Sequence, residues 1–345
     1  DALDASLGIR WMHPDAVAVA PPRKRGKWTG LAVRVGAGVL LLSVGISCLA
    51  FGGWAYGLWV STISYFCAVE FEGFITSQTL PKGLKAPPGV LRRALTATCV
   101  GINLATTAGV RQGVFESAAF VLLAALLVRR SSKSNAKKRR VRLTEMTSLV
   151  FGLFYCGYLP SFWIRLREIG AMLPTAAASS HFGSVLDAAG NVWPVGLVAT
   201  LSPILCIVAA DTGAYLGGKL LGATPLTSIS PKKTWEGAWA GLAASCGASL
   251  LLQNFFAWPH QPVWSLGLGV GVFVASLFGD LIQSSMKREA GVKDSGSIIP
   301  GHGGILDRFD SYVFTGALVY FFWYWYFYAA KGLKLSQLFV AMGGL

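Results

Sequence analysis

The residues best suited to catalysis lie close together near the C-terminus, between two long apolar runs. This interval contains Ser284–Arg288, Lys293–Gly296 and Pro300–Ser311, and Asp280 stands just before it. Carboxylates, lysines and a glycine-rich turn at a membrane edge are the groups that metal-dependent phosphate chemistry requires. A solvated loop between two membrane helices would not need these aspartates and glycines, so the sequence favours a catalytic site.

Helical spacing predicts which of these side chains meet. A helix that continues through Asp280 places Ser284 and Lys287 on the same face. Asp280 and Asp307 stand at facing ends of two apolar runs. Their hard carboxylate oxygens suit Mg²⁺, which usually also takes oxygens from substrate phosphates. We therefore expect Asp280 and Asp307 to bind the metal.

A second helix is expected to begin near Gly304 and to carry Asp307, Asp310 and Ser311 on one face. Gly303 and Gly304 would leave backbone N–H groups open at its start, a place that suits a phosphate. His302 stands between glycines, where a histidine is more often a hydrogen-bonding group than a metal ligand. No residues have the spacing of a zinc site.

The run Asp211–Lys219 joins an apolar span to a polar stretch. Asp211 and Tyr215 share a face, and the glycines around them would let another helix or a ligand come close. An acid at the end of an uncharged span is a functional candidate, and a structural polar role is the alternative.

The segment 229–237 combines hydroxyl groups, two adjacent lysines and a proline-fixed turn before an expected helix start. These groups suit a triphosphate, although the Gly-x-x-x-x-Gly-Lys pattern of a P-loop is missing. Contact with an anionic lipid is the alternative. The segment would bind both a triphosphate and a lipid if the substrate is itself an anionic lipid. The candidate residues are Ser230, Lys232, Lys233, Thr234 and Glu236.

The composition indicates a polytopic membrane protein. The 345 residues are 53% hydrophobic and only 13% charged, against about 25% charged in soluble proteins. The net charge is +14. In a membrane protein, such a charge usually comes from basic loops beside the membrane spans, so we expect no nucleic-acid binding. The six cysteines lie in apolar segments without a Cys-x-x-Cys pair and are expected to be buried thiols.

We expect an all-α bundle of about nine transmembrane helices. Its parts would be a basic N-terminal tail at 1–30, an N-terminal transmembrane region of about five helices at 31–190, a catalytic transmembrane region at 191–330 and a tail at 331–345. The expected spans are 31–51, 54–74, 94–110, 114–128, 146–164, 192–210, 237–258, 263–279 and 311–330. The third and fourth could instead form a re-entrant hairpin. Glu70 and Glu72 could face the bundle interior or the interface.

Nine crossings would place every motif on one side of the membrane. That side would also carry the N-terminal tail and the loops 76–93 and 129–145, and with them nearly all lysines and arginines. By the positive-inside rule it is the cytoplasmic-equivalent face. The few basic residues expected on the opposite side include Arg111, Arg165, Arg167, Lys331 and Lys334.

Together these motifs resemble the signature of the phosphatidate cytidylyltransferases, also called CDP-diacylglycerol synthases. The resemblance covers about 192–328 strongly and 31–75 weakly, and 76–190 matches no motif. It rests on Ser284–Arg288, Lys293–Asp294, Pro300–Gly304 and Asp307–Asp310, preceded by Asp211 and Ser230–Gly237 in the same order and spacing. The amino-acid sequence of Phe151–Pro160 and of the C-terminal half is similar to that of plastid and cyanobacterial members. A plastid (chloroplast) membrane is therefore expected, with a cyanobacterial inner membrane as the alternative.

The resemblance implies transfer of a cytidylyl group from CTP to phosphatidic acid, with release of pyrophosphate, in phosphatidylglycerol biosynthesis. It also implies Mg²⁺, a monovalent cation such as K⁺ beside it, and a homodimer. Lys219, Lys232 and Lys233 would neutralise the triphosphate. The implied catalytic residues are Asp280, Lys287, Asp307 and Asp310. The other implied substrate-binding residues are Asp211, Ser284, Arg288, Lys293, Asp294, His302, Gly303, Gly304 and Arg308.

Two other functions fit parts of the pattern. A CTP-dependent lipid kinase acting on a polyprenol would need the same triphosphate-binding groups, but it would release CDP instead of pyrophosphate. A membrane transporter would predict inverted repeats and acids near mid-span. The sequence shows no repeat, and its key acids lie at span ends.

Overall fold

The computed structural model describes residues 27–76, 87–110, 113–131, 143–172, 184–187, 189–259, 261–296, 298 and 303–330. Most of the N-terminal tail, the C-terminal tail and His302 lie outside the described residues. Within them the chain is mainly helical, with one two-stranded hairpin.

Within the described residues, nine helical segments coincide in order with the nine expected spans. They are α2 (Lys27–Phe51), α3 (Gly53–Thr76), α4 (Gly89–Thr107), α5 (Val114–Ser131), the continuous α6, η1 and α7 (Leu143–Leu153, Phe154–Tyr158, Leu159–Arg167), α9 (Val195–Leu221), α10 (Trp235–Phe256), α11 (Pro262–Glu289) and α12 (Leu306–Ala330). Those long and apolar enough to cross a membrane are Gly53–Thr76, Leu143–Arg167, Val195–Leu221 and Pro262–Glu289. The helical class is as expected, and the number of crossings stays a prediction.

The three helices that carry the aspartates extend further than the apolar runs that predicted them. α9 continues past residue 210 to Leu221, α11 continues past residue 279 to Glu289, and α12 begins at Leu306. Hydropathy marks only the apolar part of a helix, whereas backbone hydrogen bonding continues through polar residues. As a result, Asp211 and Asp280 lie inside helices.

The strands β1 (Ser184–Leu186) and β2 (Val192–Pro194) form an antiparallel hairpin just before α9. The sixth span was expected to begin at residue 192, but helix begins only after Pro194. Asp187 closes the hairpin, because its carboxylate accepts the Asn191 backbone N–H at 2.8 Å and the Trp193 indole N–H at 3.0 Å. Hydrogen bonds from Trp193 and Asn191 lower the pKa of Asp187 to about 2.

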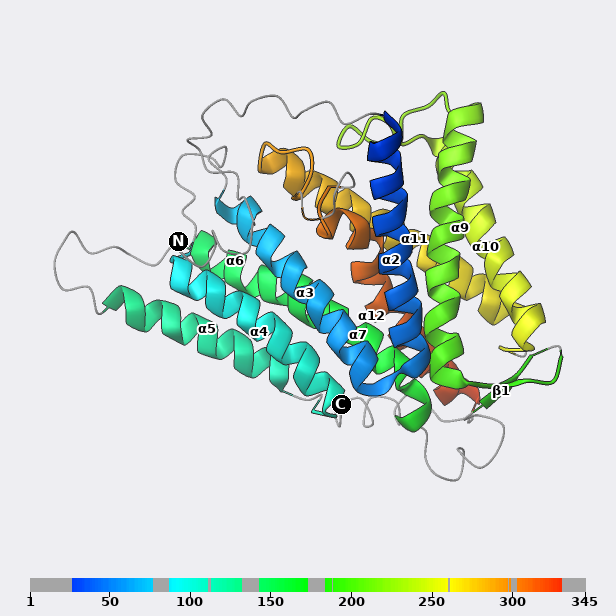
Figure 1. The fold of residues 1–345 in the computed structure, drawn as a ribbon, viewed down its shortest axis with the longest axis horizontal. Helices are drawn as coiled ribbons and strands as arrows, with labels where there is room; N and C mark the ends of the chain where they lie inside the picture. Colours follow the sequence, from blue (N-terminus) through cyan, green and yellow to red (C-terminus); the bar gives the residue numbers. More distant parts are fainter. Residues whose placement is uncertain are drawn as a thin grey trace.

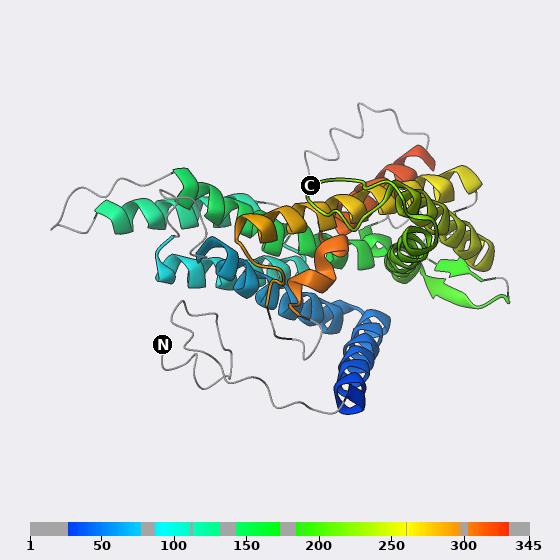
Figure 2. The same cartoon turned by 90° about the horizontal axis from the view of Figure 1, so that it is seen from above.

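Figure 1 shows α9 and α10 side by side, with their connecting loop at the upper end and the β1–β2 hairpin at the lower end. Figure 2 shows α2 standing apart from the other helices and meeting α3 at their shared turn. Arg167 of α7 caps α2 there, donating to the Leu49 and Ala50 carbonyls at 2.9 and 3.3 Å. Arg167, one of the few basic residues expected on the side of the membrane opposite the motifs, therefore has a structural role.

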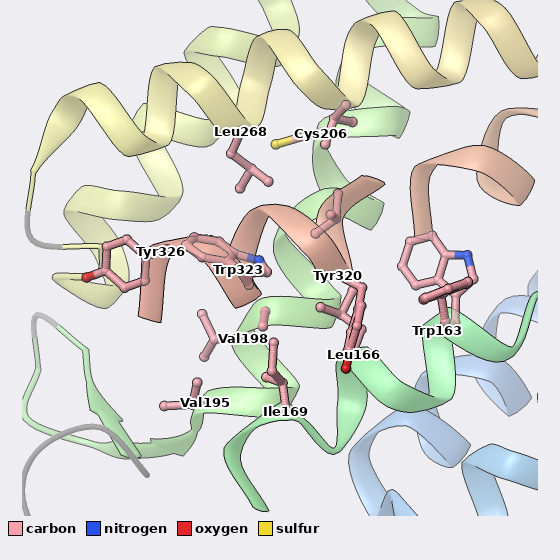
Figure 3. Close-up of a cluster of buried hydrophobic side chains, with 14 of the residues drawn as sticks. Trp163, Leu166, Ile169, Val195, Val198, Cys206, Leu268, Tyr320, Trp323 and Tyr326 are labelled. Atoms are coloured by element: carbon pink, nitrogen blue, oxygen red, sulfur yellow. The ribbon is translucent and has the colours of Figure 1, made fainter. Parts of the chain in front are cut away.

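Two hydrophobic clusters hold the helices together, and each takes side chains from both expected transmembrane regions. The first includes Trp163 of α7, Val198 of α9 and Trp323 of α12 (Figure 3). The second packs α3 to α6 against Ile305 and Leu306, at the start of α12. The start of α12 is therefore fixed by the N-terminal helices.

Pro160 explains the widened turn of η1. Because proline has no N–H, the Cys156 carbonyl lacks its usual helical donor. The Ser64 hydroxyl of α3 donates to this carbonyl. Asn103 of α4 donates to the Gly157 carbonyl at 3.3 Å. The local defect thus ties three helices together.

Candidate functional site

One cavity, of about 550 Å³, collects charged side chains from α9, the 222–234 segment, α11 and α12. The expected site residues that line it are Asp211, Lys219, Lys232, Lys233, Thr234, Asp280, Asp307 and Asp310. Tyr215 and Ser311 also line it, as the shared helix faces predicted. Three motifs that are distant in the sequence therefore meet in one place.

Small residues bring α9 and α10 close enough to form one wall of this cavity. A Cβ added at Gly213 would lie 2.6 Å from the Ala244 Cβ, and one at Gly237 would lie 2.8 Å from the Ala214 carbonyl oxygen. The expectation that another helix approaches this stretch is confirmed. Thr234 starts α10 by accepting the Gly237 N–H at 3.2 Å, which fixes the preceding lysines beside the cavity.

Lys233 and Asp280 form an ion pair across the cavity, with Nζ 2.5 Å from Oδ2. The Ser284 hydroxyl donates to the other Asp280 oxygen at 3.2 Å, one helical turn further along α11. The expected common face of Asp280 and Ser284 is confirmed. The pair joins the 229–237 motif directly to the C-terminal motif.

Asp307 is held by four donors. Lys287 Nζ and Gln283 Nε2 contact Oδ1 at 2.7 and 3.0 Å. The backbone N–H groups of Ser295 and Gly304 contact Oδ2 at 2.7 and 3.3 Å. These four donors fix the orientation of the Asp307 carboxylate.

Asp211 and Asp310 face the same cavity without a salt bridge to a basic side chain. Among the salt bridges of the described residues, none joins a lysine or arginine to either of them. Gly279 lets α12 approach α11 here, because an added Cβ would overlap the Asp310 carbonyl oxygen. The cavity thus contains more carboxylate charge than its ion pairs neutralise.

The expected phosphate site at the start of α12 is not open in the structure. The Gly304 N–H donates to Asp307, and the Ile305 and Leu306 N–H groups donate to Glu70 at 2.9 and 2.8 Å. The prediction of open N–H groups there was wrong, because two side-chain carboxylates already cap this helix. Glu70 is 1% exposed, so it faces the bundle interior rather than the interface.

Several expected binding residues lie outside the main cavity. Glu236 accepts the Ala223 and Thr224 N–H groups at 3.2 Å and holds the loop before α10. Arg288 lines a second cavity of about 410 Å³, together with Ser228 and Ser285. The others outside the main cavity are Ser230, Ser284, Lys287, Lys293, Asp294, Gly303, Gly304 and Arg308. Of these, Ser284 and Lys287 reach it through the aspartates that they contact.

Three residues that hold the site together, Gln283, Ser295 and Glu70, were not predicted from the sequence to be site residues. Gln283 lies one turn from Asp280 on α11, so helical register offered a signal for it. Ser295 and Glu70 offered none, because their contact joins segments on opposite sides of the expected domain boundary.

Comparisons with known proteins agree with this assembly of motifs. The profile of the cytidylyltransferase family matches residues 32–326. The chain is 43% identical over 323 residues to chloroplastic phosphatidate cytidylyltransferase 4 of Arabidopsis thaliana, covering 92% of this chain and 79% of that protein. It is 44% identical over 283 residues to the Arabidopsis chloroplastic phosphatidate cytidylyltransferase 5, covering 81% and 68%.

A Synechocystis phosphatidate cytidylyltransferase is 36% identical over 296 residues, covering 84% of this chain and 95% of that protein. Chloroplastic and cyanobacterial relatives and four apolar helices fit a multi-pass protein of a plastid or cyanobacterial membrane. Family match, identity and shared coverage lead to one conclusion: the chain belongs to the cytidylyltransferase family.

Proposed function

We propose that this chain is a phosphatidate cytidylyltransferase, which converts CTP and phosphatidic acid into CDP-diacylglycerol and pyrophosphate. One observation carries the proposal. Four aspartates and three lysines, drawn from three separate motifs, line a single cavity of about 550 Å³. Relatives over most of the chain carry that name.

The lysines give the cavity its affinity for a triphosphate. Lys219, Lys232 and Lys233 line it from one wall. Their ammonium groups would neutralise the bound triphosphate and the departing pyrophosphate. Lys233 is already fixed by its 2.5 Å pair with Asp280, so little reorganisation is needed when the nucleotide binds.

The donor set also fits Mg²⁺. Hard carboxylate oxygens from Asp280 and Asp307 would hold it, and Asp211 and Asp310 supply further negative charge nearby. Among the described residues, no group of three or more His, Cys, Asp or Glu side chains is arranged to hold a metal ion by itself. An open site is what Mg²⁺ prefers, since it usually takes part of its shell from substrate phosphates and water. When bound, the ion would stabilise negative charge on the phosphates, and K⁺ beside it is part of this proposal.

The reaction needs no strong general base, because the lipid phosphate is already an anionic nucleophile. One of its oxygens attacks the α-phosphorus of CTP in line. A new P–O bond forms there, and the bond from the α-phosphorus to the bridging oxygen breaks. That electron pair leaves with pyrophosphate. The chain contributes alignment and charge stabilisation. Lys287, Arg288 and Arg308 are proposed to hold the lipid phosphate.

The proposed membrane arrangement has nine crossings, with the cavity on the cytoplasmic-equivalent (stromal) face. Two observations support it: nine helical segments follow the expected order within the described residues, and all motifs gather at one end of the bundle. Contact of the basic loops with anionic lipids and assembly into a homodimer belong to the same proposal.

The test follows the label of CTP into the lipid. Purified protein in detergent receives phosphatidic acid, a polyprenol, Mg²⁺ and CTP labelled either at the α- or at the γ-phosphate. The proposal predicts that only the α-label enters the lipid and that one pyrophosphate is released for each lipid. Entry of the γ-label, with release of CDP, would identify a lipid kinase instead. Absence of both labels from the lipid would favour a transporter.

A further inference from the structure

The catalytic motif is joined to the N-terminal half of the chain through one buried carboxylate, that of Glu70 on α3. The Ser295 hydroxyl donates to Glu70 Oε2 at 2.7 Å. The backbone N–H groups of Ile305 and Leu306 donate to its two oxygens at 2.9 and 2.8 Å. Donors from both ends of the 295–306 segment therefore converge on one side chain.

Two glycines leave the room that this carboxylate occupies. A Cβ added at Gly296 would lie 2.5 Å from Glu70 Oε1. One added at Gly304 would overlap both the Ser295 hydroxyl and the Glu70 carboxylate. Hydroxyl, backbone N–H groups and glycines together form a cradle that fits the Glu70 carboxylate.

The same contacts determine where Asp307 lies. Its oxygen Oδ2 accepts the Ser295 backbone N–H at 2.7 Å, while the Ser295 hydroxyl binds Glu70. Leu306, which donates to Glu70, directly precedes Asp307 in α12. A carboxylate at a helix start also interacts favourably with the helix dipole. Glu70 thus fixes both the first turn of α12 and the residue that supports Asp307.

We propose that Glu70 is a positioning residue for cytidylyl transfer: it anchors Ser295 and the first turn of α12, and so aims the Asp307 carboxylate into the cavity. It does not line the cavity and touches no substrate there. This inference rests on the proposed function for its kinetic consequences, but the anchoring itself can be measured without any reaction.

The neighbouring acid Glu72 provides a matched control. It lies on the same helix, and its Oε1 accepts the Thr96 hydroxyl of α4 at 2.8 Å. Glu72→Gln therefore removes a charge two residues further along the same helix, on a partly buried side chain that contacts a different helix. Any effect that Glu70→Gln shows and Glu72→Gln does not belongs to the cradle.

The first measurement is amide hydrogen exchange of the whole protein in detergent. In Glu70→Gln, a single amide oxygen replaces the carboxylate, and its NH₂ group faces N–H donors. We expect the peptide that contains Ile305 and Leu306 to exchange about tenfold faster than in wild type, as loss of these bonds opens the turn. Glu72→Gln should match wild type there. Unchanged protection in Glu70→Gln would overturn the anchor.

The second measurement separates kcat from KM. Glu70→Gln should lower kcat by about 10²-fold, because a misplaced catalytic carboxylate mainly affects the transition state. KM for CTP should stay near the wild-type value, since the lysines are untouched. Ser295→Ala removes one donor, should give a smaller loss, and replaces Glu70→Gln if that variant does not fold.

A folded Glu70→Gln variant with the kcat of Glu72→Gln would overturn the positioning role, as would a rise in KM alone. If wild type itself transfers no cytidylyl group, the proposed function fails. In that case the exchange measurement still decides whether Glu70 holds the loop.

Discussion

At the scale of single residues, the four aspartates of the cavity differ in their partners. Asp280 pairs with Lys233, and Asp307 pairs with Lys287. Asp211 and Asp310 lie in the same cavity without an ion pair among the described residues. The paired aspartates are fixed before substrate arrives, and the other two offer further carboxylate oxygens beside a bound cation.

Lys287→Ala tests the pairing of Asp307. The Lys287 and Asp307 side chains are 15% and 10% exposed, and removing one partner of a buried pair costs about 3 kcal/mol of unfolding free energy. Cytidylyl transfer should fall by about 10²-fold, because a charge that orients the site is lost. Denaturant unfolding and initial rates are the measurements.

Adding Asp307→Asn to Lys287→Ala should restore most of the stability, because the unpaired charge disappears, while activity stays low. Wild-type activity in the single variant would contradict the assigned role of the pair.

The sequence predicted Asp280 with Ser284 and Lys287, and Asp307 with Asp310, because each set lies within two turns on one face of its own helix. It could not show that Glu70 caps α12, since neither residue type nor spacing links α3 to that loop. The error at Gly304, whose N–H was expected to be open, has a local cause: this N–H donates to the carboxylate of Asp307, three residues further along the chain.

At the scale of elements, the contact of α9 with α10 carries the lysine motif to the aspartates. Gly213 and Gly237 allow this approach, and Thr234 fixes the start of α10. Gly279 has the same role between α11 and α12. The order and type of the helices could be predicted from apolar runs. Their extra polar turns and the β1–β2 hairpin could not, because hydropathy is insensitive to both.

Gly213→Ala tests this contact, with Gly247→Ala as its matched control on α10. The added methyl group at residue 213 would meet Ala244 at 2.6 Å, whereas nothing lies within 4 Å of one at residue 247. We expect Gly213→Ala to lose about 1–3 kcal/mol of stability through overpacking and to lower activity as the helices separate.

Gly247→Ala should be neutral or stabilising by up to about 1 kcal/mol, because alanine favours helix. Thermal unfolding and initial rates of the two variants decide the matter. Equal behaviour of both would mean that close packing at residue 213 does not support the site.

At the scale of the whole molecule, the site and the β1–β2 hairpin lie at opposite ends of α9 (Figure 1). The two hydrophobic clusters join both transmembrane regions into one bundle. The molecule therefore keeps its charged cavity at one end and its hairpin at the other, as expected for chemistry at a single membrane face.

Cysteine labelling tests that orientation. In a variant without native cysteines, Ser228→Cys marks the loop before α10 and Ala189→Cys marks the hairpin; both positions are exposed. In sealed vesicles of one orientation, an impermeant maleimide should label only one of them, and permeabilisation should make both reactive. Labelling of both in sealed vesicles would contradict a site and a hairpin on opposite faces.

The most direct test of the central claim, that the aspartates of this cavity catalyse cytidylyl transfer, is the rate of lipid labelling from α-labelled CTP. It should be compared in wild type, Asp280→Asn, Asp307→Asn and the exposed control Glu116→Gln on α5. We predict that both aspartate variants lose at least about 10²-fold in rate while still folded, and that Glu116→Gln keeps the wild-type rate. Folded aspartate variants with wild-type rates would contradict the account and move the chemistry out of this cavity.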